Sequence, residues 1–216
     1  MGKSTSSSTI TLPKNWPSQL PYLITPTHSP NLTPSNLAAI RIPPSPSDPL
    51  PIIPKSYKPG PCQSVRITPI TDPAHPAHNQ SGLFAATNLQ PGQLILPYIG
   101  ELHSSLPNPS YDYSSSDYDL WVDREGDVAV DASRMGNEAR FVNDFRGVPG
   151  KMEGGKSKAN AEFKVVWDER RKERVMGVFV LGEGKSGKVK GIRKGEEILV
   201  SYGRGFWGER RGDEGC

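Results

Sequence analysis

Cysteine is almost absent from this chain, and its scarcity excludes two kinds of architecture. Cys62 and Cys216 are the only cysteines among 216 residues. Neither a disulfide framework nor a zinc cluster can be built from this chain alone. We therefore expect no metal site, and we expect a reducing compartment rather than a secreted protein.

Long apolar runs are also missing. No segment approaches the roughly 18 consecutive apolar residues that a membrane helix needs, and the N-terminus lacks the apolar core of a signal peptide. Residues 1–6 fit the loose template for myristoylation, a pattern short enough to recur by chance. The sequence thus predicts no membrane partner.

Charge of one sign is not abundant overall, but it is unevenly distributed. The formal net charge is only +3, whereas residues 151–195 hold 13 Lys or Arg against six Asp or Glu. This segment is either a basic face that contacts nucleic acid or a nucleosome, or a solvated loop. No interleaved aromatic pattern favours nucleic acid.

Proline is plentiful and divides the chain. Fourteen of the 22 prolines lie in residues 1–61, mixed with Ser, Thr and Asn. Such a segment has little apolar surface to offset its ordering entropy. We predict a disordered tail over residues 1–61, a folded domain over residues 62–208 and a short C-terminal tail over residues 209–216.

The folded part is predicted to consist mainly of short β-strands without long helices. Apolar and β-branched runs bounded by turn residues indicate strands within residues 64–70, 82–86, 93–99, 118–123, 128–131, 162–167, 175–181 and 197–201. Residues 124–127 read as a hairpin turn, and Asn137 as the N-cap of a short helical turn. Residues 102–116 and 148–159 are expected to be loops, where substrate discrimination would lie.

Two segments carry a resemblance to a known family. The sequences of residues 137–144 (NEARFVND) and 195–203 (GEEILVSYG) resemble the signature motifs of SET-domain protein lysine methyltransferases. The resemblance covers about residues 64 to 208. It implies a fold of small curved sheets with a C-terminal pseudoknot, in which the last segment threads under a preceding loop.

The first half of the resemblance implies part of the site. Residues 79–85 resemble the family's glycine loop beside the cofactor, which would place Ser81, Gly82 and Leu83 against S-adenosylmethionine. Gln80 stands where the first glycine is usual. Tyr98, in a Tyr-x-Gly segment, would line the channel that receives the lysine, although a tyrosine ending a strand is more often a packing residue.

The motif at residues 140–144 implies further cofactor contacts, from Arg140, Phe141, Asn143 and Asp144. Asp144 replaces the usual histidine, and the usual continuation is missing. Asn160 is a candidate for the displaced asparagine. A carboxylate at position 144 leaves open a degenerate SET fold that does not bind the cofactor.

The C-terminal motif would supply Tyr202 at the methyl-transfer centre and, by the same resemblance, at the cofactor. Tyr118 matches a cofactor-side tyrosine of some members, and Phe206 an aromatic that packs on adenine. Aromatic residues near a C-terminus also commonly close a core, and this alternative stays open for Phe206 and Trp207. The three-cysteine post-SET zinc cluster of many members is absent.

The predicted function is that of an enzyme, a protein-lysine N-methyltransferase that uses S-adenosylmethionine. By family analogy the substrate is a histone tail, or another lysine-containing protein, and the location is nuclear chromatin or the cytoplasm. The alternative is a catalytically inactive SET-fold module that binds partners. A third hypothesis, nucleic-acid binding by residues 151–195, would show a steep salt dependence.

Overall fold

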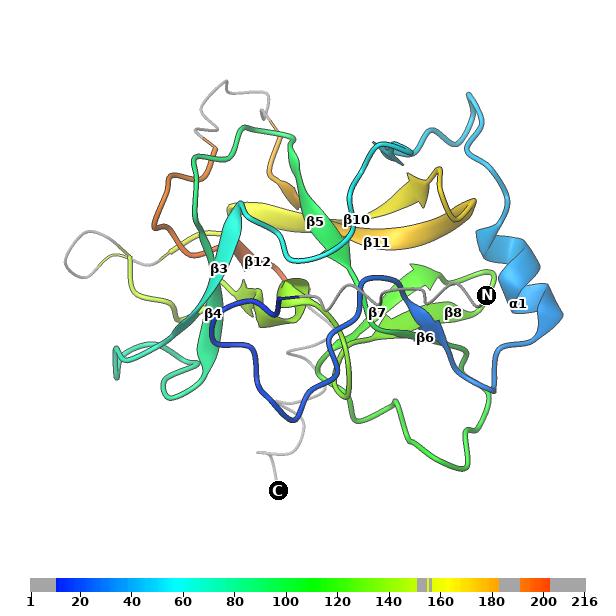
Figure 1. Cartoon of the computed structure of the whole chain (residues 1–216), viewed down its shortest axis with the longest axis horizontal. Coiled ribbons are helices and arrows are strands. Elements are labelled where there is room, and N and C mark those ends of the chain that lie inside the picture. Colours follow the sequence, from blue (N-terminus) through cyan, green and yellow to red (C-terminus); the bar gives the residue numbers. More distant parts are fainter. Residues whose placement is uncertain (1–10, 151–154, 156, 183–190, 203–216) are drawn as a thin grey trace, which may run out of the picture.

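Short β-strands dominate the regular structure, and helices are few (Figure 1). The computed structural model describes residues 11–150, 155, 157–182 and 191–202. In this described part, the helical elements are α1 (Pro34–Ile40) and the 3-10 turn η1 (Glu138–Phe141). The mainly β class predicted from the sequence is confirmed.

The largest hairpin lies in a four-stranded sheet with the order β2-β10-β11-β5. Its members are β2 (Ile52–Ile53), β10 (Ala161–Asp168), β11 (Glu173–Val180) and β5 (Leu94–Tyr98). Strands β10 and β11 pair antiparallel along their full length. Strand β5 then pairs with β11, which places the end of β5 beside the centre of the molecule.

A second four-stranded sheet has the order β1-β6-β8-β7. It contains β1 (Thr27–His28), β6 (Glu101–His103), β8 (Val128–Asp131) and β7 (Asp119–Asp123). Strands β7 and β8 form the predicted hairpin, in which Asp127 has a φ of 52°. Asp123 accepts a hydrogen bond from the Gly126 amide, which helps to close this turn at 2.8 Å.

Two small sheets carry the segments of the family resemblance. Strands β3 (Val65–Pro69) and β4 (Ser81–Ala85) pair antiparallel. Strands β9 (Asn143–Asp144) and β12 (Leu199–Val200) pair parallel. This parallel pair sets the C-terminal strand beside the 140–144 motif, as the predicted pseudoknot requires.

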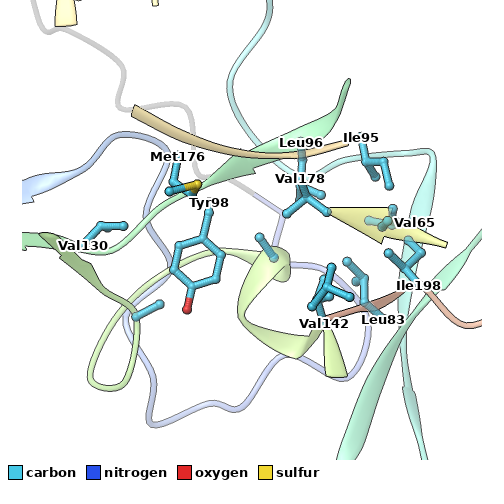
Figure 2. Close-up of a cluster of buried hydrophobic side chains, with 14 of the residues drawn as sticks. Val65, Leu83, Ile95, Leu96, Tyr98, Val130, Val142, Met176, Val178 and Ile198 are labelled. Carbon is cyan, nitrogen blue, oxygen red and sulfur yellow. The ribbon is translucent and has the colours of Figure 1, made fainter. Parts of the chain in front are cut away.

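The hydrophobic core lies between these sheets and η1. Figure 2 shows Leu96 of β5 and Val178 of β11 packed above Val142, Leu83 and Ile198. Leu83, Val178 and Ile198 are fully buried. One continuous core therefore joins the strand pairs that carry the candidate site.

The N-terminal segment differs from its prediction. The disorder predicted for residues 1–61 is wrong for residues 11–61, which pack on the domain; residues 1–10 lie outside the described residues. Trp16 is buried and packs edge to face with Tyr22 and Phe141, with ring centroids 4.9 and 5.7 Å apart. A few apolar anchors suffice because the prolines already restrict the unfolded chain.

Buried hydrogen bonds reinforce this attachment. The Tyr22 hydroxyl donates to Oε2 of Glu138 at 2.9 Å, and the Cys62 amide donates to Oε1 at 2.8 Å. Glu138 is almost fully buried at the start of η1. The backbone of residues 21–23 also bonds to Gly136 on both sides. The N-terminal segment thus holds the turn that carries the 140–144 motif.

Helix α1 belongs to the same segment. Thr33 caps it in a capping box with Asn36, whose side-chain amide also donates to the Gly126 carbonyl at 2.8 Å. Ile40 is fully buried. The helix is therefore anchored on the turn of the β7–β8 hairpin. The average composition of residues 1–61 could not reveal this contact.

A buried histidine secures the predicted loop over residues 102–116. In the His103 ring, Nδ1 lies 3.0 Å from the Ser104 carbonyl and Nε2 lies 2.8 Å from the Asp119 carboxylate. Both partners accept, so both are satisfied only when the ring is protonated. Burial lowers the pKa of His103, but the hydrogen bond and charge of Asp119 raise it above the usual value on balance. Tyr113 stacks on this ring, with centroids 3.7 Å apart.

The first prediction concerns the N-terminal segment. Trp16→Ala should lower the free energy of unfolding by about 3 kcal/mol, because it removes a buried indole from the core. Denaturant unfolding measures this loss. Leu12→Ala in the same segment is the control, since Leu12 is 49% exposed. Equal stability of both variants would show that residues 11–61 do not pack as described.

The second prediction concerns pH. Because the folded pKa of His103 is raised, its stabilisation is fully present below about pH 6.5 and is lost as pH rises through the folded value. Asp119→Asn should therefore lower the melting temperature more at pH 6 than at pH 9. A loss that is the same at both pH values, measured by thermal melts in matched buffers, would contradict a charged His103.

Candidate functional site

One cavity gathers most of the predicted site residues. Its volume is about 400 Å³, and four separate segments of the chain line it. The lining residues are His75, Pro76, Ala77, Gln80, Ser81, Asp117, Tyr118, Arg140, Phe141, Asn143, Asp144, Arg146 and Tyr202. Sequence motifs more than a hundred residues apart therefore meet at one place.

The turn η1 is fixed to the end of β5 by its N-cap residue. The Asn137 side chain accepts a hydrogen bond from the Ala139 amide, as predicted, and also from the Ile99 amide at 3.2 Å. Its Nδ2 donates to the Pro97 carbonyl at 2.8 Å. Asn137 is buried. The orientation of the following motif is thus set by the end of β5.

Arg140 lies on the cavity wall, but its guanidinium N–H groups donate to backbone carbonyls. Its Nε donates to the Ala132 carbonyl at 2.8 Å and its Nη2 to the Ser133 carbonyl at 3.2 Å. The guanidinium stands 4.4 Å from the centroid of the Tyr118 ring. Arg140 therefore positions Tyr118 and the turn after β8.

Asn143 is held by a carboxylate. Its Nδ2 donates to Oε1 of Glu197 at 2.9 Å and lies 3.5 Å from the Ser81 carbonyl. A Cβ on Gly82 would lie 2.5 Å from that Glu197 oxygen, so only glycine permits the approach. Ser81 thus contributes to this wall of the site, and Gly82 leaves room for the Glu197 carboxylate behind it.

Asp144 connects the 140–144 motif to the C-terminal motif. Its Oδ2 accepts from Nη1 of Arg146 and from the Tyr202 amide, each at 2.7 Å. Its Oδ1 accepts from the Arg146 amide at 2.8 Å. The Asp144 side chain is only 5% exposed. The carboxylate at this unusual position is therefore paired, and it fixes the backbone of Tyr202.

Tyr202 places its ring at the same cavity. Its hydroxyl donates to the Val142 carbonyl at 2.7 Å. Burial, and then the charges of Tyr118, Asp144 and Glu197, raise its pKa above the usual value. The phenol stays neutral at physiological pH, so Tyr202 can align a reacting group by hydrogen bonding but is not a base.

Tyr98 and Leu83 lie behind the cavity. Tyr98 is buried at the end of β5, and its hydroxyl donates to the Tyr118 carbonyl at 2.8 Å. Figure 2 shows its ring in the core cluster, with the hydroxyl directed away from Met176. Burial raises its pKa, with a further contribution from nearby Tyr202. Leu83 is a core side chain.

Of the predicted residues, the structure brings Ser81, Tyr118, Arg140, Phe141, Asn143, Asp144 and Tyr202 to the cavity wall. Gly82 adjoins it through Asn143. Phe206 and Trp207 lie outside the described residues. Asn160 does not replace a cavity residue, because its side chain bonds the backbone of Glu197 and Leu199, each at 2.8 Å.

Three residues of the site escaped the sequence analysis: His75 and Arg146, which line the cavity, and Glu197, which holds Asn143 from behind it. Glu197 stands inside a quoted motif, so the motif could have marked it. His75 lies in the connection between β3 and β4, where no periodicity or spacing singles it out. Its place in the cavity wall and its contact with Glu197, at 3.1 Å, show that it belongs to the site.

Ion pairs partly neutralise the basic segment of residues 151–195. Of its described members, Lys164, Arg170, Arg171 and Arg174 make ion pairs with Glu162, Asp168, Glu173 and Asp48. Lys158, Arg193 and Lys194 line a separate depression. The number of positively charged side chains available to a partner is therefore smaller than the number of Lys and Arg residues in this segment.

The described residues form neither a metal-binding cluster nor a membrane-spanning helix. Among them, no group of three His, Cys, Asp or Glu side chains could hold a metal ion. None of the described helices has the length and apolar character needed to cross a bilayer.

Comparison with known proteins gives one family. The family model described as SET domain matches residues 80–203, more than half of the chain. No curated protein matches.

Several solved structures of polycomb repressive complex 2 match part of this chain. A humanized mutant of the Chaetomium thermophilum complex with the inhibitor GSK343 is 21% identical, with a TM-score of 0.47. An active complex in the basal state is 21% identical, with a TM-score of 0.48. In both cases the match covers 66% of this chain and 15% of the other. An autoinhibited complex bound to S-adenosylmethionine is 19% identical, with a TM-score of 0.45 and coverage of 71% and 17%.

The third prediction tests Asp144. Asp144→Asn should lower the free energy of unfolding by about 2 kcal/mol, because the new amide group would face the donors of Arg146 and Tyr202. Denaturant midpoints measure the change, and Asp112→Asn is the exposed control. Asp144→His should also destabilise the fold, although it restores the residue usual in the family. A stable Asp144→His variant would refute the role of this carboxylate.

Proposed function

Because this chain belongs to the SET-domain family, we propose that it is a protein-lysine N-methyltransferase that uses S-adenosylmethionine. The observation that carries this proposal is the convergence of Asn143, Asp144 and Tyr202 on one cavity. The parallel pairing of β9 with β12 produces this convergence. Function lies in such a site rather than in the fold.

The cavity fits the cofactor in size and in chemistry. Its volume of about 400 Å³ lies within the range of small-molecule sites. Phe141 and Tyr118 offer aromatic surface for a nucleoside. Oδ1 of Asn143 accepts no hydrogen bond from the described residues, which leaves an acceptor at the wall for a cationic amino group. Ser81, Gly82, Arg140 and Asp144 complete the proposed binding site.

The bound cofactor supplies a methyl group already activated by the positive charge of its sulfonium. The lysine must arrive as a neutral amine, since free lysine, with a pKa of about 10.4, is almost wholly protonated at pH 7. Tyr98 and Tyr202 provide a partly dry, aromatic environment that disfavours the ammonium form. Tyr98 thus acts from behind the cavity, next to Tyr118.

The reaction is a displacement at the methyl carbon. With the cofactor bound, the nitrogen–carbon bond would form as the carbon–sulfur bond breaks, and the electron pair of the broken bond would stay on the departing sulfur. The methylated nitrogen carries one positive charge and later releases a proton to solvent. Tyr202, neutral and fixed by Asp144, contributes alignment, which can supply several kcal/mol.

The substrate class we propose is a histone tail, with nuclear chromatin as the location. The family resemblance supports this choice. Residues 157–182 and 191–194 offer a modest basic surface for a nucleosome, since Lys158, Arg193 and Lys194 lie together. Another lysine-containing protein would use the same chemistry.

The fourth prediction tests Tyr202. Tyr202→Phe should reduce methyl transfer at least about a hundredfold, the scale for one positioned polar group at a transition state. The fold should persist, since the Tyr202 backbone amide still donates to Asp144. The assay follows transfer of tritiated methyl from S-adenosylmethionine to core histones and to a cell extract.

Tyr111→Phe is the matched control, because the Tyr111 hydroxyl bonds Ser133 rather than a cavity residue. It should keep wild-type activity. Full activity of Tyr202→Phe would remove Tyr202 from the reaction. A wild-type protein that binds the cofactor without methylating either substrate would support the inactive binding module instead.

A further inference from the structure

We propose that His75 is a positioning residue that orients Asn143 toward the cofactor. The inference rests on the proposed function, because it gives the cavity of that function a second supporting layer. The connection between β3 and β4, residues 70–80, forms one wall of the cavity.

This connection is a built structure rather than a loose loop. The Ile70 amide donates to the Gln80 carbonyl at 2.8 Å, and the Asn79 amide returns to the Ile70 carbonyl at 3.1 Å. Within it, the His75 amide donates to the Asp72 carbonyl and the His78 amide to the His75 carbonyl. The position of His75 is therefore defined by backbone bonds on both sides.

The same connection touches the opposite side of the cavity. A Cβ on Gly147 would lie 2.8 Å from Cγ of Pro76, so Pro76 sits directly against the turn that follows Asp144. Gly147 has a φ of 79°, which also favours glycine there. The β3–β4 connection therefore contacts two later segments of the chain. His75 contacts Glu197, just before β12, and Pro76 contacts Gly147, just after β9.

The hydrogen bonds of His75 define its tautomer. Nδ1 accepts a hydrogen bond from the Ala77 amide at 3.0 Å, so it carries no proton. The neutral ring therefore holds its proton on Nε2, which donates to Oε2 of Glu197 at 3.1 Å. The His75 side chain is 6% exposed and that of Glu197 10%. This bond satisfies one oxygen of a nearly buried carboxylate.

The other oxygen of Glu197 determines the orientation of Asn143. A carboxylate only accepts, so Asn143 must present its amide nitrogen to Oε1, at 2.9 Å. Its oxygen is then left as the acceptor for the cofactor. The chain from Ala77 through His75 and Glu197 ends at a side chain of the cavity wall, and each member fixes the next.

Three variants test this arrangement. His75→Ala should weaken S-adenosylmethionine binding by about tenfold, measured by calorimetry, because Glu197 loses its charge-assisted donor and no longer holds Asn143. His75→Gln should remain within about threefold of wild type, since its amide nitrogen can replace the Nε2 donor. His78→Ala is the matched control, an exposed histidine in the same connection, and should bind as wild type.

A double-mutant cycle separates positioning from general destabilisation. Asn143→Ala should weaken binding more than His75→Ala does, and adding His75→Ala to Asn143→Ala should cost nothing further. Additive losses, or an equal loss in His75→Gln and His75→Ala, would overturn the proposal.

A ligand-free measurement keeps this inference distinct from the proposed function. In the wild type and in His75→Gln, the side-chain amide protons of Asn143 should exchange slowly by NMR, and in His75→Ala they should exchange fast. If the wild type binds no cofactor, the proposed function fails, while this result still decides the role of His75. Slow exchange in all three proteins would refute that role.

Discussion

The hydrogen bond from the Tyr202 amide to the Asp144 carboxylate is the contact on which the candidate site depends. It is 2.7 Å long and largely buried, and it stands at the end of the parallel β9–β12 pair. Parallel strands so far apart in sequence need such specific contacts, because no tight turn sets their register. Arg146 forms an ion pair with Asp144, so the buried Asp144 carboxylate has a compensating charge.

The other layers of the molecule support this contact from two directions. Trp16 and Tyr22 of the N-terminal segment contact η1, which leads into β9. The β3–β4 connection reaches Glu197, just before β12. A site made from the N-terminal, central and C-terminal parts of the chain is therefore held by the same core that stabilises the fold, and damage to either support should reach the cavity.

Local patterns predicted much of the fold, because short strands and caps follow from neighbouring residues. The β7–β8 hairpin and the Asn137 cap were found in this way. The two-residue strands β1, β2 and β9 were not, since they exist only through distant partners. The tail prediction failed at residues 11–61 because average composition hides single anchors such as Trp16 and Ile40. Motif resemblance identified seven cavity residues, whereas His75 depends on a contact that spans 122 positions and leaves no local pattern.

The claim that the cavity holds S-adenosylmethionine has a direct test, namely a calorimetric titration of the cofactor into the full chain. We expect saturable binding at one site, with a negative heat-capacity change from burial of apolar surface. A folded protein that shows no saturable binding at millimolar cofactor would contradict it. The cavity of Asn143, Asp144 and Tyr202 would then be a structural feature of the fold rather than a cofactor site.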